Sequence, residues 1–189
     1  MNRVLLGLFI GVFVLALASS VSAQEAVIRT VVDNGGCPLI ADNRTEYKLN
    51  VHVDNTELNE ATDGVGWAVV APQGVDFIVT RVNGTENNRP ENDFFAGKDM
   101  FWELVRAEFN HLHARITELG QGVLDGQGNV VTYTFTISSV SRPMRTSFGL
   151  SGVNFIPPEG QQSQRFRIEN QQFVILPDNF PAMSAKCAR

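Results

Sequence analysis

A strict alternation of apolar and polar side chains in residues 131–137 constrains the fold of this chain more than any other feature. The apolar members are Val131, Tyr133, Phe135 and Ile137, and the polar members are Thr132, Thr134 and Thr136. Successive side chains of a β-strand point to opposite faces, so this pattern predicts a strand with one packed face and a threonine face in water. Residues 47–53 alternate in the same way. Both segments therefore belong to sheets with one buried face.

Further strands are predicted between Gly, Asn, Asp and Pro residues, which recur roughly every ten to fifteen positions. The predicted segments are 26–32, 65–71, 75–82, 147–155 and, interrupted by polar residues, 166–176. Pro72, Pro157 and Pro177 stand where such strands should stop. We therefore expect an all-β fold, an immunoglobulin-like or jelly-roll β-sandwich of about nine strands.

Residues 99–119 allow two interpretations. Apolar residues at 101, 105, 109, 112, 116 and 119 fall on one helical stripe, and Gly120 would end that helix. Read with a period of two, the same segment forms two strands around a turn at Asn110-His111. Because every neighbouring segment has strand character, we favour the hairpin and keep the helix as the alternative.

The N-terminal 23 residues have the three parts of a secretory signal. Arg3 supplies the positive charge, residues 4–18 form the apolar run, and Val21-Ser22-Ala23 provides small residues for a peptidase. We expect cleavage after Ala23, with an uncleaved anchor helix as the alternative. We expect the remainder to form a domain at 24–177 and a tail at 178–189, to lack a membrane span, and to be secreted to the extracellular space or cell surface.

Charge and cysteine content narrow the function classes. The net charge of −5 becomes −6 once Arg3 is removed, and Lys and Arg do not cluster. A nucleic-acid partner is therefore not expected, since such proteins need a basic surface to displace counterions. Cys37 and Cys187 can pair in an oxidising compartment and would close a loop of about 150 residues. Two unpaired thiols are the alternative.

Several strand segments resemble the cohesin family. Residues 128–137 look like the cohesin strand in which a glycine turn leads into alternating apolar residues, and 47–54, 64–70 and 75–82 are similar to early cohesin strands. The turn at 71–74, Ala-Pro-Gln-Gly, departs from the Tyr-Asp-Pro-like turn of many cohesins. The resemblance extends to carbohydrate-binding modules of the same architecture. It implies a binding domain whose partner is a dockerin-like or other extracellular protein, or a polysaccharide.

The residues that could support catalysis do not form a recognised motif. Gly149-Leu-Ser-Gly-Val153 lacks the last glycine of a serine hydrolase elbow. His111 and His113 have the spacing of two zinc ligands on one strand face, but two ligands do not make a site. We therefore predict no catalytic residues, no metal site and no enzyme activity.

Two groups of residues are candidates for binding. Phe94, Phe95 and Trp102 form an aromatic-rich stretch that could stack on a sugar or contact a partner, with core burial as the alternative. Loop residues Asp54, Asn55, Asp63, Asp93 and Asp99 carry oxygen ligands suited to a structural calcium ion, although their spacing matches no calcium motif. Otherwise no cofactor is expected.

These observations together predict a secreted noncatalytic binding module for extracellular adhesion or assembly. A self-assembling structural protein of a surface layer, filament or matrix, associating through sheet edges, is the alternative.

Overall fold

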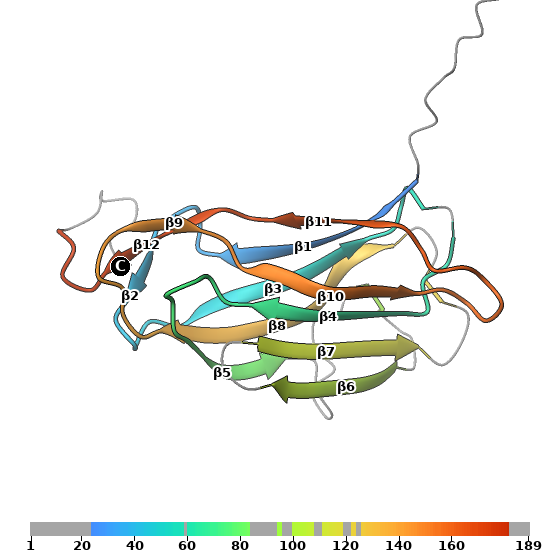
Figure 1. Ribbon diagram of the computed structural model, residues 1–189, viewed down its shortest axis with the longest axis horizontal. Coiled ribbons are helices and arrows are strands. Elements are labelled where there is room, and N and C mark those ends of the chain that lie inside the picture. The colour runs from blue at the N-terminus through green and yellow to red at the C-terminus, as the bar shows by residue number, and fades with distance from the viewer. Residues whose placement is uncertain are drawn as a thin grey trace, which may run out of the picture.

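A computed structural model describes residues 24–58, 60–83, 94–95, 100–107, 111–118, 122–123 and 126–181, with the backbone alone described at 83, 100–107 and 111–118. Over these ranges the chain forms strands and no helix, and the two larger sheets overlap as two layers (Figure 1). The predicted all-β sandwich is thus confirmed. The signal segment 1–23 and the tail from 182 onward lie outside the described residues.

Three sheets make up the fold. The first has the order β11-β1-β3-β8-β5, formed by Phe166–Asn170, Ala26–Asp33, Tyr47–Asp54, Gln127–Ile137 and Phe77–Asn83. The second has the order β10-β4-β7-β6, formed by Gly149–Ile156, Gly64–Val70, His111–Glu118 and Met100–Ala107. The third, β2-β12-β9, consists of Leu39–Ala41, Phe173–Pro177 and Met144–Thr146 and lies at one end of the sandwich, at left in Figure 1.

The segment at 99–119 is the hairpin. Strands β6 and β7 pair antiparallel from Met100↔Glu118 to Ala107↔His111, so the helical interpretation is wrong. Apolar residues spaced by three and four positions fit a helix, but they also fit two short strands joined by a turn. The hairpin adds two strands to β4, on which Gly64 pairs with Thr117 and Val70 with His111.

Strand pairing differs from the prediction near the C-terminus. The predicted strand 166–176 is two strands, because Gln171 and Gln172 separate β11, which pairs parallel to β1, from β12, which pairs parallel to β2. Short β2 and β9, with three residues each, were not predicted. These differences raise the number of strands in the described residues from about nine to twelve.

The threonine face of β8 is not in water, contrary to expectation. Thr132, Thr134 and Thr136 are only 3%, 8% and 6% exposed. Strand β8 lies inside the sheet between β3 and β5, where longer neighbours screen short side chains. Asn50 on β3 is one such neighbour: its Oδ1 accepts a hydrogen bond from the Thr132 hydroxyl at 2.7 Å.

The core is rich in aromatic side chains. Phe148 contacts Phe77, Phe135 and Phe173, with ring centroids 5.2, 5.1 and 5.4 Å away. Because Phe173 belongs to β12, these rings join the third sheet to the main sandwich. Deeper between the two layers, Trp67 Nε1 donates to the Tyr133 hydroxyl at 3.2 Å, which satisfies a polar tip that would otherwise be costly to bury. Burial raises the pKa of that hydroxyl, so Tyr133 stays neutral.

Candidate functional site

On the outer face of the four-stranded sheet, strand β4 carries small residues. On β4 the core-facing residues are Val65, Trp67 and Val69, so the alternate positions Gly64, Gly66 and Ala68 belong to the outer face. Gly64 and Ala68 are buried and Gly66 is half-buried, so β4 itself exposes little surface on this face.

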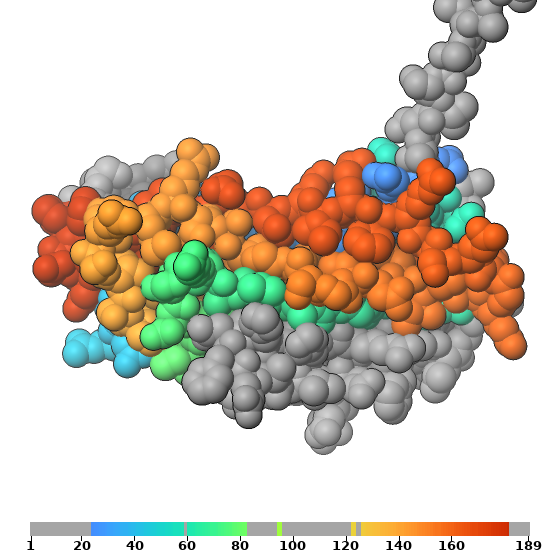
Figure 2. All heavy atoms as spheres, viewed as in Figure 1, coloured from blue at the N-terminus to red at the C-terminus, as the bar shows by residue number. Residues whose placement is uncertain are grey.

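Strand β10 gives this face an exposed polar border. Ser151 pairs with Ala68 and Asn154 with Gly66, and both β10 residues are exposed. The register shifts between them, where Gly152 takes a φ of +58° that favours glycine. The bulge therefore gives the border a local bend and directs polar groups toward solvent. In Figure 2, β10 appears as the orange band across the front of the molecule.

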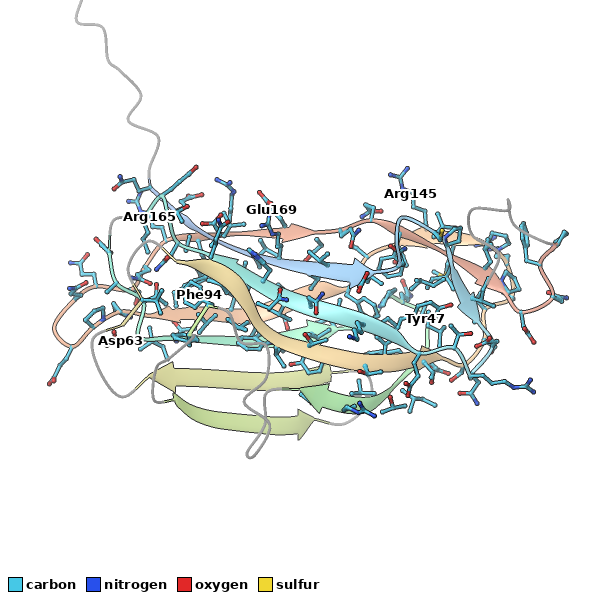
Figure 3. All side chains as sticks on the ribbon, turned by 180° about the vertical axis from the view of Figure 1, so that it is seen from behind. Tyr47, Asp63, Phe94, Arg145, Arg165 and Glu169 are labelled. Atoms are coloured by element: carbon cyan, nitrogen blue, oxygen red, sulfur yellow. The ribbon has the colours of Figure 1, made fainter. Side chains whose placement is uncertain are left out.

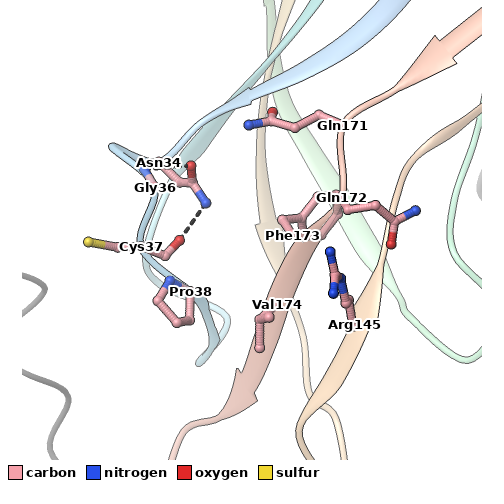
Figure 4. A pocket seen from close by; sticks show the side chains of 9 residues that line it. All are labelled: Asn34, Gly36, Cys37, Pro38, Arg145, Gln171, Gln172, Phe173 and Val174. Carbon is pink, nitrogen blue, oxygen red and sulfur yellow. Dashed lines mark hydrogen bonds between the residues drawn. The ribbon is translucent and has the colours of Figure 1, made fainter.

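A small pocket lies at the end of the sandwich that carries the third sheet. Its volume is about 230 Å³. It is lined by Asn34, Gly36, Cys37, Pro38, Arg145, Gln171, Gln172, Phe173 and Val174. Asn34 shapes its rim, because its Oδ1 accepts from Gly36 N at 3.1 Å and its Nδ2 donates to the Cys37 carbonyl (Figure 4). The amides and the exposed Arg145 make this pocket polar, and its described lining contains no carboxylate or histidine that could act as an acid or base.

The opposite end of the sandwich is held by a buried polar network. The Asn55 side chain donates from Nδ2 to Val123 O at 2.7 Å and to Thr62 Oγ1 at 3.0 Å, and its Oδ1 accepts from Gly126 N at 2.7 Å. Thr62 in turn donates to Gln164 Oε1 at 2.8 Å. Three loops are thus joined by side-chain hydrogen bonds. Asn55, a candidate calcium ligand, has its amide oxygen engaged by a backbone N–H.

The carboxylate of Asp54, another candidate calcium ligand, is bound within its own turn. Its Oδ1 accepts from Thr56 N at 3.0 Å and from Thr56 Oγ1 at 2.7 Å. Partial burial acts to raise the pKa of Asp54, but these hydrogen bonds, with Arg29 and His52 nearby, outweigh it and lower the pKa.

The remaining calcium candidates are divided between described and undescribed parts of the chain. The structure places Asp63 at the start of β4, while Asp93 and Asp99 lie outside the described residues. Within the described ranges no group of three or more His, Cys, Asp or Glu side chains is placed to hold a metal ion.

The aromatic residues that we predicted to bind a ligand are not at the surface where they are described. Phe94 and Phe95 are 3% and 0% exposed, and their rings pack edge to face with centroids 4.8 Å apart (Figure 3). Trp102 lies on β6 opposite Ile116, with its side chain outside the described part. Ligand binding by this group stays a prediction, and at Phe94 and Phe95 it would require the rings to leave the core.

The other residues singled out in the sequence are spread over the fold. His111 pairs with Val70 and His113 with Ala68, which puts both on the four-stranded sheet. Cys37 follows β1 and Cys187 lies outside the described residues, so the disulfide stays a prediction. Cys37 N donates to Asn34 O at 3.0 Å, and in Figure 4 its sulfur points away from Gln171 and Arg145.

Sequence reasoning missed the polar border formed by β10 and the pocket. Ser151 was noted as part of a hydrolase-like fragment, yet Gly149-Leu-Ser-Gly is a strand that bulges at Gly152. A glycine between alternating residues is the signal that could have indicated this bulge. The pocket left no such signal, because it depends on parallel pairing of distant segments.

No protein-family model matches the sequence, and no curated protein matches it. Solved structures do resemble the fold. A non-cellulosomal cohesin from the archaeon Archaeoglobus fulgidus superposes with a TM-score of 0.56 at 13% identity, covering 82% of this chain and 94% of its own. The chain has a cohesin-type fold.

Two further cohesins extend this likeness. The cohesin module of a family 33 glycoside hydrolase from Clostridium perfringens has a TM-score of 0.56 at 9% identity, covering 80% of this chain and 98% of its own. A type I cohesin from Clostridium thermocellum, solved in complex with a dockerin, has a TM-score of 0.55 at 11% identity, covering 80% and 99%. The cohesin-type resemblance read from the strand segments is thereby confirmed at the level of the fold.

Proposed function

We propose that this chain is a noncatalytic binding module that recognises a dockerin-like protein outside the cell. The observation that carries the proposal is the cohesin-type fold, which covers nearly the whole of cohesins solved with dockerins bound. The signal-like segment at 1–23 supports action outside the cell. No helix in the described residues is long and apolar enough to cross a membrane.

We place partner binding on the outer face of the β10-β4-β7-β6 sheet. A stable protein interface buries about 800 Å² on each partner, an area that a whole sheet face offers and a pocket of about 230 Å³ does not. Exposed Ser151 and Asn154 on β10 supply polar groups for the rim.

The test is calorimetric titration of the purified secreted chain with a panel of isolated dockerins, alongside binding to insoluble polysaccharides. We expect binding to a dockerin and none to polysaccharide. A cohesin with its own dockerin serves as the positive control. If no dockerin binds and a polysaccharide does, the module belongs to the carbohydrate-binding class instead.

The position of the site is tested by Ser151→Arg, which places a long charged side chain on the border of the face. Ser139→Arg is the matched control, since Ser139 is exposed in the loop after β8. We expect the first variant to weaken partner binding about tenfold, because the long side chain obstructs the docked partner at the rim, and the second to leave binding unchanged. Equal affinities in the two variants would move the site elsewhere.

A further inference from the structure

Strand β11 is an edge with little protection against pairing. In the described structure it bonds to β1 on one side and ends the five-stranded sheet. Residues 167–170 are exposed, and Ile168 is 41% exposed, unusual for a large apolar side chain on a strand. The strand contains neither proline nor bulge, and its two charged side chains, Arg167 and Glu169, are of opposite sign and so do not repel a second copy. It runs along the rim of the sheet, where Figure 3 marks Glu169.

The backbone of β11 presents a regular set of hydrogen-bonding groups to this edge. Ala26 N donates to Arg165 O at 2.9 Å, and Gln171 N donates to Thr30 O at 3.1 Å. In a parallel pair, backbone groups of alternate residues face the partner strand, so 165, 167, 169 and 171 face β1. Phe166, Ile168 and Asn170 therefore direct their N–H and C=O groups toward the open edge.

The side chains of β11 are complementary to a reversed copy of themselves. Antiparallel pairing with Ile168 opposite Ile168 of a second copy puts Arg167 opposite Glu169 of that copy, and the reverse. The register with β1, where Arg167 pairs with Val27 and Glu169 with Arg29, places both charges on the outer face of the sheet. Within one chain Arg167 Nε already lies 3.0 Å from Glu169 Oε1, so two copies would form a ring of four alternating charges.

We propose that β11 pairs antiparallel with β11 of a second copy of this chain to form a two-fold dimer. Phe166, Ile168 and Asn170 exchange backbone hydrogen bonds across the axis, six in all by the antiparallel pattern. The two five-stranded sheets become one continuous sheet. The apolar side chains of Ile168 from both copies meet beside the Phe155–Phe166 stack, whose ring centroids lie 5.6 Å apart.

The contact closes on itself and does not propagate. A two-fold interface uses the same edge of both copies, so no β11 edge remains to recruit a third. The opposite edge of the sheet, β5, is less suited to pairing because its register shifts between Val79 and Arg81. The dimer therefore differs from the filament that sheet-edge assembly could otherwise produce.

Analytical ultracentrifugation of the secreted chain from about 10 µM to 1 mM tests the dimer. A short edge contact belongs to the weak class of interfaces, so we expect a dissociation constant on the order of 100 µM. Arg167→Glu opposes like charges at both symmetric positions, and we expect it to weaken the dimer about tenfold. Glu169→Arg does the same. A wild-type chain that stays monomeric over the whole range overturns the proposal.

The double variant Arg167→Glu with Glu169→Arg distinguishes this register from general charge effects. It restores opposite charges across the axis, so the dissociation constant should return to near the wild-type value. Arg142→Glu, in the exposed loop between β8 and β9, is the charge-matched control and should leave association unchanged. If the double variant is as weak as the single variants, the pairing is wrong. Each variant's circular dichroism and melting temperature confirm that it folds, and dockerin titration reports separately on the proposed function.

Discussion

The substitution Asn55→Ala tests how much the side-chain hydrogen bonds add to the backbone hydrogen bonds that also join the loops at this end of the sandwich. It removes three hydrogen bonds from a side chain with no exposed surface. Val123 O keeps a second donor, Thr62 N at 2.9 Å, and Thr62 Oγ1 still donates to Gln164. The group deprived of its partner is the amide of Gly126.

The magnitude follows from this count. Each lost hydrogen bond reduces the free energy of unfolding by about 1 kcal/mol, and leaving the Gly126 amide without a partner costs about 1–3 kcal/mol. The second cost already includes the loss of the hydrogen bond from Gly126. We expect Asn55→Ala to reduce the free energy of unfolding by about 3 kcal/mol. For a domain of this size the melting temperature should fall by roughly 6–12 °C.

The assay is urea unfolding followed by tryptophan fluorescence, at constant pH and with the same m-value required of both proteins. Glu57→Ala, an exposed neighbour in the same turn, is the control and should change stability by less than about 0.5 kcal/mol. A loss of less than 1 kcal/mol for Asn55→Ala would refute the reasoning, since it would mean that water or another group replaces the amide.

A second variant, Asn55→Asp, adds a pH signature. The new carboxylate keeps an acceptor for Gly126 N but faces the Val123 carbonyl, so burial and that oxygen favour its protonated form. Its pKa in the folded state is then above the unfolded value, and the folded state binds more protons. The variant should therefore gain stability relative to wild type as pH falls from 7 to 5. A pH-independent difference would contradict this arrangement of partners.

Three further outcomes are expected. Phe148→Ala should lower the free energy of unfolding by about 3–5 kcal/mol in the same urea assay, because the ring is 1% exposed and joins the third sheet to the sandwich. A loss below about 1.5 kcal/mol would show that neighbouring side chains fill the space left by the ring. The lowered pKa of Asp54 contributes stability above its ordinary value of 3.8, and this stability is lost as pH falls through the folded pKa. Asp54→Asn should therefore lose less stability than wild type between neutral and acid pH. The same pH dependence of the free energy of unfolding in both proteins would count against the Thr56 hydrogen bonds. Mass spectrometry of the unreduced protein should show a mass lower by two hydrogens, from the Cys37–Cys187 bond, and two free thiols would end that prediction.

The alternating strands could be predicted because their pattern is local. Residues 47–53 and 131–137 have a period of two, and the structure places them next to each other as β3 and β8. At 99–119 the apolar spacing fits a helix as well as a hairpin, so only the strand character of the neighbouring segments favours the hairpin.

Pairing between strands that are far apart in the sequence could not be predicted from such local patterns. Residues 166–176 show one interrupted pattern, yet Gln171 and Gln172 divide it between two sheets. Gln171 helps to make this division, since its Oε1 accepts the Val32 N–H at 2.6 Å beyond the end of β11. A polar residue with such a role looks like any loop residue in the sequence.

The binding surfaces were the least predictable part. Aromatic residues were the natural candidates for ligand contact, but the same ring area that binds a sugar also stabilises a core, and Phe94 and Phe95 are buried. The outer face of β4 instead carries the small residues Gly66 and Ala68. Alternation shows that these positions share a face, but it does not show how much of that face is exposed.

The parallel pairing of β1 with β11 has a consequence for the order of folding. The first strand of the domain gains this neighbour only after residue 170 has been synthesised, so the five-stranded sheet cannot be complete in any shorter nascent chain. Contacts between such distant segments make folding slow, because the intervening chain must first be ordered. A chain built in this way remains incompletely folded until nearly all of the domain has emerged from the ribosome.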